Sequence, residues 1–297
     1  MAIKKLPSTG DMPRSTGVPE SLVPGGAHDS AGFTWEGRTF DHHGTAFADD
    51  TGETPEAVSN AITAVRDCVA KLTEEVDAEK QAALLNELAE AQANVVAVCS
   101  GERFLIPLIT EAGDFGLTPE GKVVEKSQEL SIVTVKAPDG RGAMPVFTSV
   151  AAMQAWNAES RPIPVPGAQV ALAAAQEETD LVIIDPGQEA TEFAVRRPLL
   201  EAFALGTTVL PSWADPEVQE AFAASVSDEP HVRHVVLAPG DPAGRLRGPE
   251  TSVGLVLEPG LDQQTLQQLL GRLQQRWAAN ERIARSVDAL GVKLHSA

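Results

Sequence analysis

Residues 139–156 read DGRGAMPVFTSVAAMQAW and contain a turn, a strand and a helix in close succession. The Pro-Asp-Gly tripeptide at 138–140 makes this strand the second arm of a hairpin whose first arm is 130–137. Thr148 and Ser149 stand where the strand passes into the helix, a position typical of an N-cap, whose oxygen accepts a hydrogen bond from a free backbone N–H. The stretch therefore predicts a mixed α/β domain with a strand-to-helix corner.

The alternation of strands and helices continues on both sides of this stretch. Apolar runs bounded by turn residues predict one strand before it, and two strands and two helices after it. Between them, SRPIPVPG at 160–167 is predicted to be a rigid loop, because its three prolines restrict φ. The predicted elements are the strand 103–110, the helix 167–178, the strand 180–185, the strand 191–197 and a helix that ends at Gly206.

Two helices are predicted ahead of this region. Thr54 is a suitable N-cap, Pro55 suits the first helical position and Glu56 favours the positive end of the helix dipole. Apolar residues follow at helical spacing as far as Leu72, and a second helix is predicted over 77–98. The short link between the two helices predicts an αα-hairpin.

The C-terminal region is predicted to be a second αβ domain. From residue 207 the signals follow the order β-α-β-β-α-β, with Asp215 and Pro216 opening the first helix and a long second helix from Asp262. This order matches a ferredoxin-like unit of about 90 residues. The predicted organisation is a disordered tail over 1–33, an arm and the αα-hairpin over 34–100, an αβ domain over 101–206 and the ferredoxin-like domain over 207–297.

Composition and charge limit the partners. The chain has 297 residues, of which 43% are hydrophobic, and a net charge of −19. Nucleic-acid backbones and anionic membrane surfaces are bound through concentrated basic surfaces, so neither is expected as a partner. Residues 251–297 carry 5 Lys and Arg against 4 Asp and Glu, a net charge of +1, which leaves −20 on the rest. This segment is therefore the less repulsive place for self-association or for an acidic partner.

The chain has two cysteines, Cys68 and Cys99, and both fall in the apolar helical stretches. Neither belongs to a C-x-x-C pair, so buried free thiols in a reducing cytoplasm are expected. No apolar run follows the N-terminal lysines, and no stretch approaches the ~18 apolar residues of a membrane span. Neither a signal peptide nor a membrane-spanning segment is expected.

Several motifs resemble those of one family. In order along the chain, EKSQELSIVTVKAPDGRGAMPVFTSVAAMQAW, SRPIPVPG and DLVIIDPG are similar to the N-terminal domain of the SseB family, the enhanced serine sensitivity proteins. WEGRTF, FADDTGETPEA and RFLIPLI resemble its actinobacterial branch, and the region after 207 resembles its C-terminal domain more weakly. The resemblance implies a bacterial cytoplasmic α/β protein and supplies neither a reaction nor a ligand.

The hydroxyls of Thr148 and Ser149 lack the setting of a catalytic nucleophile. A nucleophile elbow needs flanking glycines, an oxyanion hole and a base held by a carboxylate. VFTSVAA contains no glycine, and no histidine lies within 101–206. An N-cap is therefore the favoured interpretation, and no catalytic residue is assigned.

A small ligand at the same corner is the alternative interpretation. No Asp or Glu follows in the first turn of the helix, so its N-terminus is predicted to be open to an external anion. Asp185 follows a buried strand, where α/β sheets open a ligand crevice, although Asp-Pro-Gly is also an ordinary turn and the turn is favoured. The candidate ligand-binding residues are Lys126, Arg141, Thr148, Ser149, Arg161 and Asp185.

No metal or cofactor is expected. His42 and His43, with the aspartates around them, match no standard ligand spacing, and the chain has neither a P-loop nor a G-x-G-x-x-G motif. Three functions stay open: a non-enzymatic cytoplasmic protein that binds a protein partner or itself, a sensor of a small anionic or zwitterionic ligand such as an amino acid or another metabolite, and an unrecognised enzyme. The first is favoured, because no catalytic constellation is recognisable and exposed sheet edges and faces associate.

Overall fold

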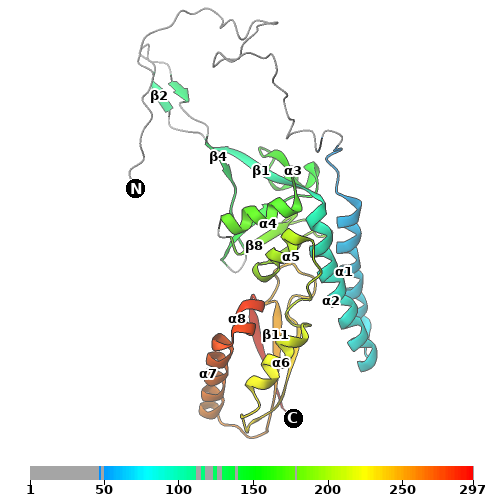
Figure 1. Ribbon diagram of the computed structural model, residues 1–297, viewed down its shortest axis with the longest axis vertical. Helices are drawn as coiled ribbons and strands as arrows, with labels where there is room; N and C mark the ends of the chain where they lie inside the picture. Colours follow the sequence, from blue (N-terminus) through cyan, green and yellow to red (C-terminus); the bar gives the residue numbers. More distant parts are fainter. Residues whose placement is uncertain are drawn as a thin grey trace, which may run out of the picture. The chain divides into compact units, whose positions relative to one another are not determined.

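The computed structural model describes residues 47, 50–111, 115–117, 123–125, 129–137, 140–177 and 179–296, without the side chains of 109–132. The chain divides at residue 50, and the unit 50–297 is a mixed α/β structure, which confirms the predicted class (Figure 1). Several predictions lie outside the described residues: the tail over 1–33, most of the arm, the interpretation of His42 and His43, and Lys126.

The predicted αα-hairpin is confirmed. Helices α1 (Glu56–Glu74) and α2 (Ala78–Gly101) pack side by side (Figure 1). The prediction for the start of α1 is wrong, because Pro55 holds the N-cap position and makes no side-chain bond there. The hydroxyl of Thr54 is hydrogen-bonded to the hydroxyl of Thr148 instead, 94 residues away.

A four-stranded sheet of order β5-β6-β8-β9 forms the centre of the unit. β6 and β8 are parallel neighbours, while β5 and β9 run antiparallel to them. Parallel neighbours need a crossover, and here the chain passes through α3 (Val150–Trp156), β7 (Arg161–Pro166) and α4 (Gly167–Gln176) before it returns as β8. The strands are β5 (Val135–Lys136), β6 (Gly142–Val146), β8 (Leu181–Ile184) and β9 (Phe193–Arg196).

A second sheet of order β4-β1-β7 adjoins the central one through a bridge between Leu105 and Phe147. The predicted first arm of the hairpin is divided, since only β5 pairs with β6 and the earlier residues pair with β1 as β4. The proline-rich segment predicted as a loop is the edge strand β7, where prolines are tolerated because one side of the strand needs no N–H. The strands are β1 (Arg103–Glu111), β4 (Glu129–Ile132) and β7 (Arg161–Pro166), with a separate pair β2 (Phe115–Leu117) and β3 (Val123–Glu125).

The main core forms where α2, α4 and α5 meet the central sheet. The ring of Phe104 from β1 packs edge-on against Phe203 from α5, with centroids 6.2 Å apart. Gly167 begins α4 directly beside the end of α2, and its N–H donates to the carbonyl of Glu102 at 2.8 Å. The helices of this part are α3 (Val150–Trp156), α4 (Gly167–Gln176) and α5 (Leu200–Leu205), with the short 3₁₀-helix η2 (Arg197–Leu199).

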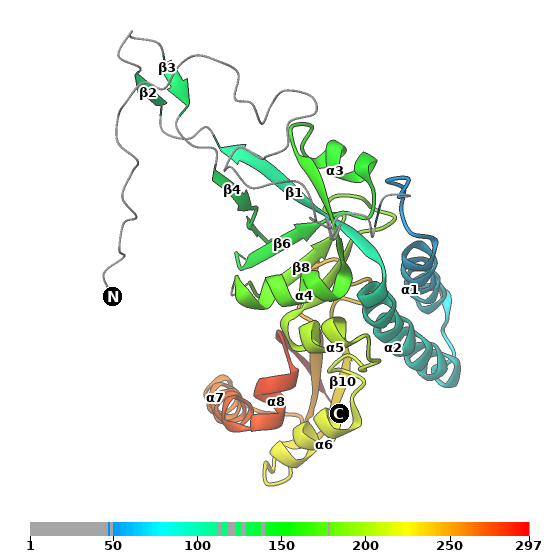
Figure 2. The ribbon, with the colours of Figure 1, turned by 45° about the horizontal axis from the view of Figure 1, so that its top comes forward.

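The C-terminal part is a three-stranded sheet of order β10-β11-β12 with three helices gathered around it (Figure 2). β10 and β11 are antiparallel, and β11 and β12 are parallel. A separate core joins Phe222 and Trp277 from the helices to Leu255 from β11. The elements are α6 (Pro216–Ser225), β10 (Val232–Pro239), β11 (Thr251–Leu257), α7 (Gln263–Ala279), α8 (Glu281–Ser286) and β12 (Leu290–Ser296).

The ferredoxin-like arrangement is not confirmed, because residues 207–212 form no strand. This segment joins the sheet through side chains instead: the Ser212 N–H donates to Glu250 at 3.3 Å, and the hydroxyls of Ser212 and Thr251 lie 2.6 Å apart. The predicted long second helix is also interrupted, since Asn280 ends α7 and caps α8 with its side chain. The β-branched pattern at 207–212 predicted a strand, but contacts far along the chain decided its conformation.

Candidate functional site

Thr148 and Asp185 meet at the carboxyl ends of two parallel strands. β6 and β8 are in register as far as Val146 opposite Ile184, so the residues that follow them emerge at one edge of the sheet. The Thr148 N–H donates to Asp185 Oδ1 at 2.7 Å, and the Thr148 hydroxyl donates to Oδ2 at 2.5 Å. Neither residue has exposed surface. The structure therefore brings these two predicted site residues together as a closed pair.

Asp185 is also the start of the predicted turn. Its φ of 46° is in the left-handed region, which costs a non-glycine residue of the order of 1–3 kcal/mol. The Gln188 N–H closes the turn by donating to the Asp185 carbonyl at 3.0 Å. Burial raises the pKa of Asp185, and the hydrogen bonds from Thr148 and Thr191 oppose that rise. The turn thus directs a carboxylate inward, against its preference for water.

Arg103 and Asp50 complete the corner, and sequence reasoning missed both. Arg103 donates to the Thr148 carbonyl and to the Glu53 carbonyl, each at 2.6 Å, and its Nε lies 2.8 Å from a carboxylate oxygen of Asp50. The hydroxyls of Thr54 and Thr148 are hydrogen-bonded at 2.8 Å. The available signal was a charged residue opening an apolar strand, in RFLIPLIT. These contacts tie the segment before α1 to the start of β1.

Ser149 is the N-cap of α3, as predicted, and its hydroxyl accepts a hydrogen bond from the Ala152 N–H at 3.1 Å. The Val150 N–H donates to the Gly52 carbonyl at 2.9 Å. Gly52 has a φ of +74°, and a Cβ there would lie 2.9 Å from Val150 Cγ2, so the approach requires glycine. The sequence predicts an external anion at the N-terminus of α3. Two of the N–H groups there already donate to oxygens of the protein.

The predicted basic residues do not gather at this corner. Arg141 precedes β6, whose length separates it from Thr148 by about 20 Å at the rise of an extended strand. It binds Asp288 through two hydrogen bonds, at 2.6 and 2.9 Å. Arg161 is exposed at the start of β7, opposite Leu108 of β1. A ligand at the Thr148 corner stays a prediction that these arginines do not support.

Replacing Asp185 by alanine is expected to lower the free energy of unfolding by about 2–3 kcal/mol at neutral pH, because the buried N–H and hydroxyl of Thr148 lose their acceptor. Alanine also tolerates the left-handed φ poorly. Asp185→Asn is the matched control, since asparagine keeps an acceptor and enters this region more readily. Urea unfolding followed by circular dichroism measures both variants, and an equal loss in the two would contradict the assigned contacts.

The stability of the wild type relative to Asp185→Asn is expected to fall as the pH rises. Because burial raises the pKa of Asp185 above its ordinary value of 3.8, the native state holds this proton more tightly than the unfolded state. The cost of the buried charge is absent below that ordinary value and grows as the pH passes through the folded pKa. Urea unfolding of both proteins at several pH values measures the difference between their free energies of unfolding. A difference that does not change with pH would contradict the assignment.

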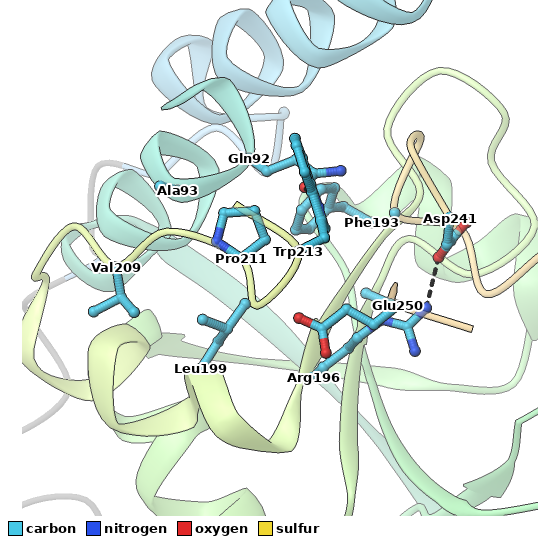
Figure 3. A pocket seen from close by; sticks show the side chains of 12 residues that line it. Gln92, Ala93, Phe193, Arg196, Leu199, Val209, Pro211, Trp213, Asp241 and Glu250 are labelled. Carbon is cyan, nitrogen blue, oxygen red and sulfur yellow. Dashed lines mark hydrogen bonds and ion pairs between the residues drawn. The ribbon is translucent and has the colours of Figure 1, made fainter. Parts of the chain in front are cut away.

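A second buried polar cluster joins the end of β9 in the central sheet to residues that flank the C-terminal strands, and Figure 3 shows its members Arg196, Asp241 and Glu250. Arg196 at the end of β9 donates to Asp241 at 2.8 Å and to Asp288 at 2.9 Å, and all three side chains are buried. Glu250 lies beside Arg196 and accepts from the Asp288 N–H at 2.9 Å, and burial raises its pKa. The adjoining cavity is about 30 Å³, room for about one water molecule. This cluster is therefore a structural junction and not a ligand pocket.

The helical hairpin is attached to the same junction. Trp213 lies next to Pro211 and Phe193 in Figure 3, and its indole N–H donates to the Gln92 side chain at 3.3 Å. The Gln92 amide in turn donates to the Pro242 carbonyl at 2.8 Å. A buried glutamine on an otherwise apolar helix face thus links α2 to the loop after β10.

The histidines that the structure describes lie away from the Thr148 corner. His231 precedes β10, His234 lies in β10 and His295 lies in β12, all outside the sheet that carries Thr148. In the part of the chain that the structure describes, no cluster of three or more His, Cys, Asp or Glu side chains is placed to hold a metal ion.

The fold and the two polar clusters define a mixed α/β protein whose buried charges link its parts. Residues 66–202 match the SseB protein N-terminal domain, a range that begins within α1, ends within α5 and contains the Thr148–Asp185 corner. Residues 66–202 therefore carry an SseB N-terminal domain, which confirms the predicted resemblance to the SseB family over this range. No curated protein and no solved structure matched the chain. None of the helices among the described residues is both long enough and apolar enough to span a membrane.

Proposed function

We propose that the protein is a non-enzymatic cytoplasmic interaction protein that associates with a second copy of itself through strand β12. The free edge of β12 is the observation that carries this proposal. β12 pairs with β11 without interruption from Leu290 opposite Thr251 to Ser296 opposite Leu257. No strand of the described ranges pairs with its other side. Such an edge offers unpaired N–H and C=O groups to an added strand.

The opposite edge of the sheet is protected, and the β12 edge is not. β10 has a register shift between Val232 and His234, and bulges of this kind discourage edge pairing. β12 has no bulge, and Leu294 is 43% exposed. β10 also exposes an apolar residue, Val236, at 50%, so it is the regular register of β12 that supports pairing there in preference to β10.

Charge also supports an approach on this side. By register, one face of the sheet turns away from Leu255 and its core, and the six central positions on this face include no carboxylate. These positions are His234, Val236, Gly254, Val256, Lys293 and His295. Two copies with a net charge of −19 each repel least where acidic residues are missing.

The cysteines and the Thr148 corner support the non-enzymatic, cytoplasmic part of the proposal. Cys68 and Cys99 are buried free thiols, as expected in a reducing compartment. Burial raises the pKa of both thiols, which keeps them protonated and weakly nucleophilic. The Thr148 hydroxyl is occupied by Asp185 and Thr54 and has no exposed surface, which is unfavourable for attack on a substrate.

Light scattering across a wide range of protein concentrations tests self-association, because mass action makes the dimer fraction rise with concentration. Leu294→Glu is expected to weaken dimerisation by about tenfold or more, since it places a carboxylate on the edge that pairs. Leu172→Glu is the matched control, because Leu172 is exposed on α4, away from this sheet. A monomer at every concentration, or equal weakening by both substitutions, would sink the proposal.

A further inference from the structure

A groove runs between α5 and α8, away from the Thr148 corner. One end has a volume of about 540 Å³ and is lined by Arg141, Arg197 and Arg285. The other end has a volume of about 400 Å³, and its lining mixes apolar side chains, among them Leu205 and Val209, with polar and charged ones. Pro198, Glu201 and Arg285 line both ends, so the two volumes form one continuous groove. Each volume lies within the range of about 300–1,000 Å³ typical of small-molecule sites.

The first end, here called the cationic end for its three arginines, is also lined by Asp180, Glu201 and Asp288. Two of its guanidinium groups, those of Arg197 and Arg285, have at most a long contact with a carboxylate among the described residues. Arg285 is exposed and makes no hydrogen bond or ion pair with the residues that the structure describes. Arg197 is 73% exposed, and its contact with Asp180 is long, at 3.4 Å. Arg141 differs, because Asp288 holds it at the base of the groove. Two available planar donors at one end of a groove are suited to the oxygens of a carboxylate or phosphate.

The other end of the groove, here called the apolar end, has leucine and valine side chains that are exposed to solvent, which is energetically unfavourable. Leu205 is 67% exposed and Val209 is 41% exposed, and both line the groove. Leu199 and Leu210 lie beside them and continue into the main core. Exposed leucine and valine next to a cavity mark a place where an apolar group would be removed from water.

We propose that this groove binds a small amphipathic organic anion. Its carboxylate or phosphate lies between Arg197 and Arg285, and its apolar part lies along Leu205 and Val209. Glu201 and Asp180 also line the cationic end, so a cation is the alternative occupant that the test must separate from an anion. This site is independent of the β12 edge, and its failure would leave the proposed self-association intact.

Calorimetric titration of the full chain with octanoate tests the proposal, with octylamine and acetate as comparison probes. Octanoate carries both required groups, octylamine reverses the charge and acetate lacks the apolar tail. Saturable binding of octanoate with one site is expected, with no comparable binding of octylamine or acetate. The overall charge of −19 would favour octylamine, so a preference for octanoate points to the local arginines.

Arg197→Gln and Arg285→Gln are each expected to weaken octanoate binding by about tenfold or more, because each removes charge-assisted hydrogen bonds. Arg233→Gln is the matched control, since Arg233 is an exposed arginine in β10 that pairs with Glu258. Leu205→Ser is expected to weaken octanoate binding through the other end of the groove. Absence of saturable binding, equal binding of octylamine, or unchanged affinity in both arginine variants would overturn the proposal.

Discussion

Gly167→Ala is expected to lower the free energy of unfolding by at least about 4 kcal/mol, a large fraction of the roughly 5–15 kcal/mol by which a folded domain is stable. A Cβ at residue 167 would lie 1.8 Å from the carbonyl oxygen of Cys99 and 3.0 Å from Cε2 of Phe203. Backbone cannot yield as a flexible side chain does, so α2 and α4 would have to separate. That separation would disrupt the core in which Cys99 and Phe203 are buried. Guanidinium unfolding followed by circular dichroism measures the loss.

Gly271→Ala provides the control for this substitution. Gly271 lies in the interior of α7, and a Cβ there would meet no atom within 4 Å. Because alanine restricts the unfolded chain more than glycine does, this variant is expected to gain roughly 0.5–1 kcal/mol of stability. Opposite signs for the two glycine substitutions would identify the close approach of α2 and α4 as the cause. An unchanged unfolding midpoint for Gly167→Ala would contradict that packing.

Arg196→Met is expected to cost about 3–5 kcal/mol, because it leaves buried carboxylates without their partner. The side chains of Arg196, Asp241 and Asp288 are 6%, 2% and 3% exposed. Asp288 retains Arg141, so the chief loss falls on Asp241. Asp241 also accepts from three backbone N–H groups of its own loop, from residue 245 to residue 247. Removal of the arginine therefore destabilises both the junction and that loop.

The matched control for Arg196→Met is Arg233→Met. Arg233 and Glu258 form an exposed pair, 52% and 42% exposed, and such pairs contribute little to stability because solvent screens them. The double variant Arg196→Met with Asp241→Asn is expected to recover part of the lost stability, since asparagine removes the unpaired charge and retains an acceptor. Urea unfolding at neutral pH measures all three proteins. Equal losses in Arg196→Met and Arg233→Met would contradict a buried network.

The structure separates basic residues that the sequence analysis placed at one ligand site. Arg141 was predicted beside Thr148 as an anion-binding residue, but it lies at the far end of β6 and is held by Asp288. Among the arginines that line the groove, Arg197 and Arg285 have at most a long contact with a carboxylate, and no motif indicated either of them. Closeness in the sequence was misleading for Arg141. Each residue of a strand advances the chain by several ångströms, so residues at the two ends of a strand lie far apart.

The sequence by itself determined much of the local structure, although not the N-cap of α1 or the strand β7. Ser149, Asp215 and Asp262 were placed at helix starts by their side chains, and all three cap the expected helices. An N-cap involves the N–H groups two or three residues ahead, so its signal is contained in a short window. The αα-hairpin and the Asp-Pro-Gly turn depend on equally short windows, and both are present.

Only the tertiary structure decided which distant groups meet. Arg196 is 45 residues from Asp241 and 92 from Asp288, and Thr54 is 94 residues from Thr148. Whether residues 207–212 pair as a strand depends on the surfaces that adjoin them, as does the division of the first hairpin arm between two sheets. The physical reason is that backbone geometry follows from neighbours in the chain, whereas burial, ion pairing and pKa follow from the neighbours that folding brings together.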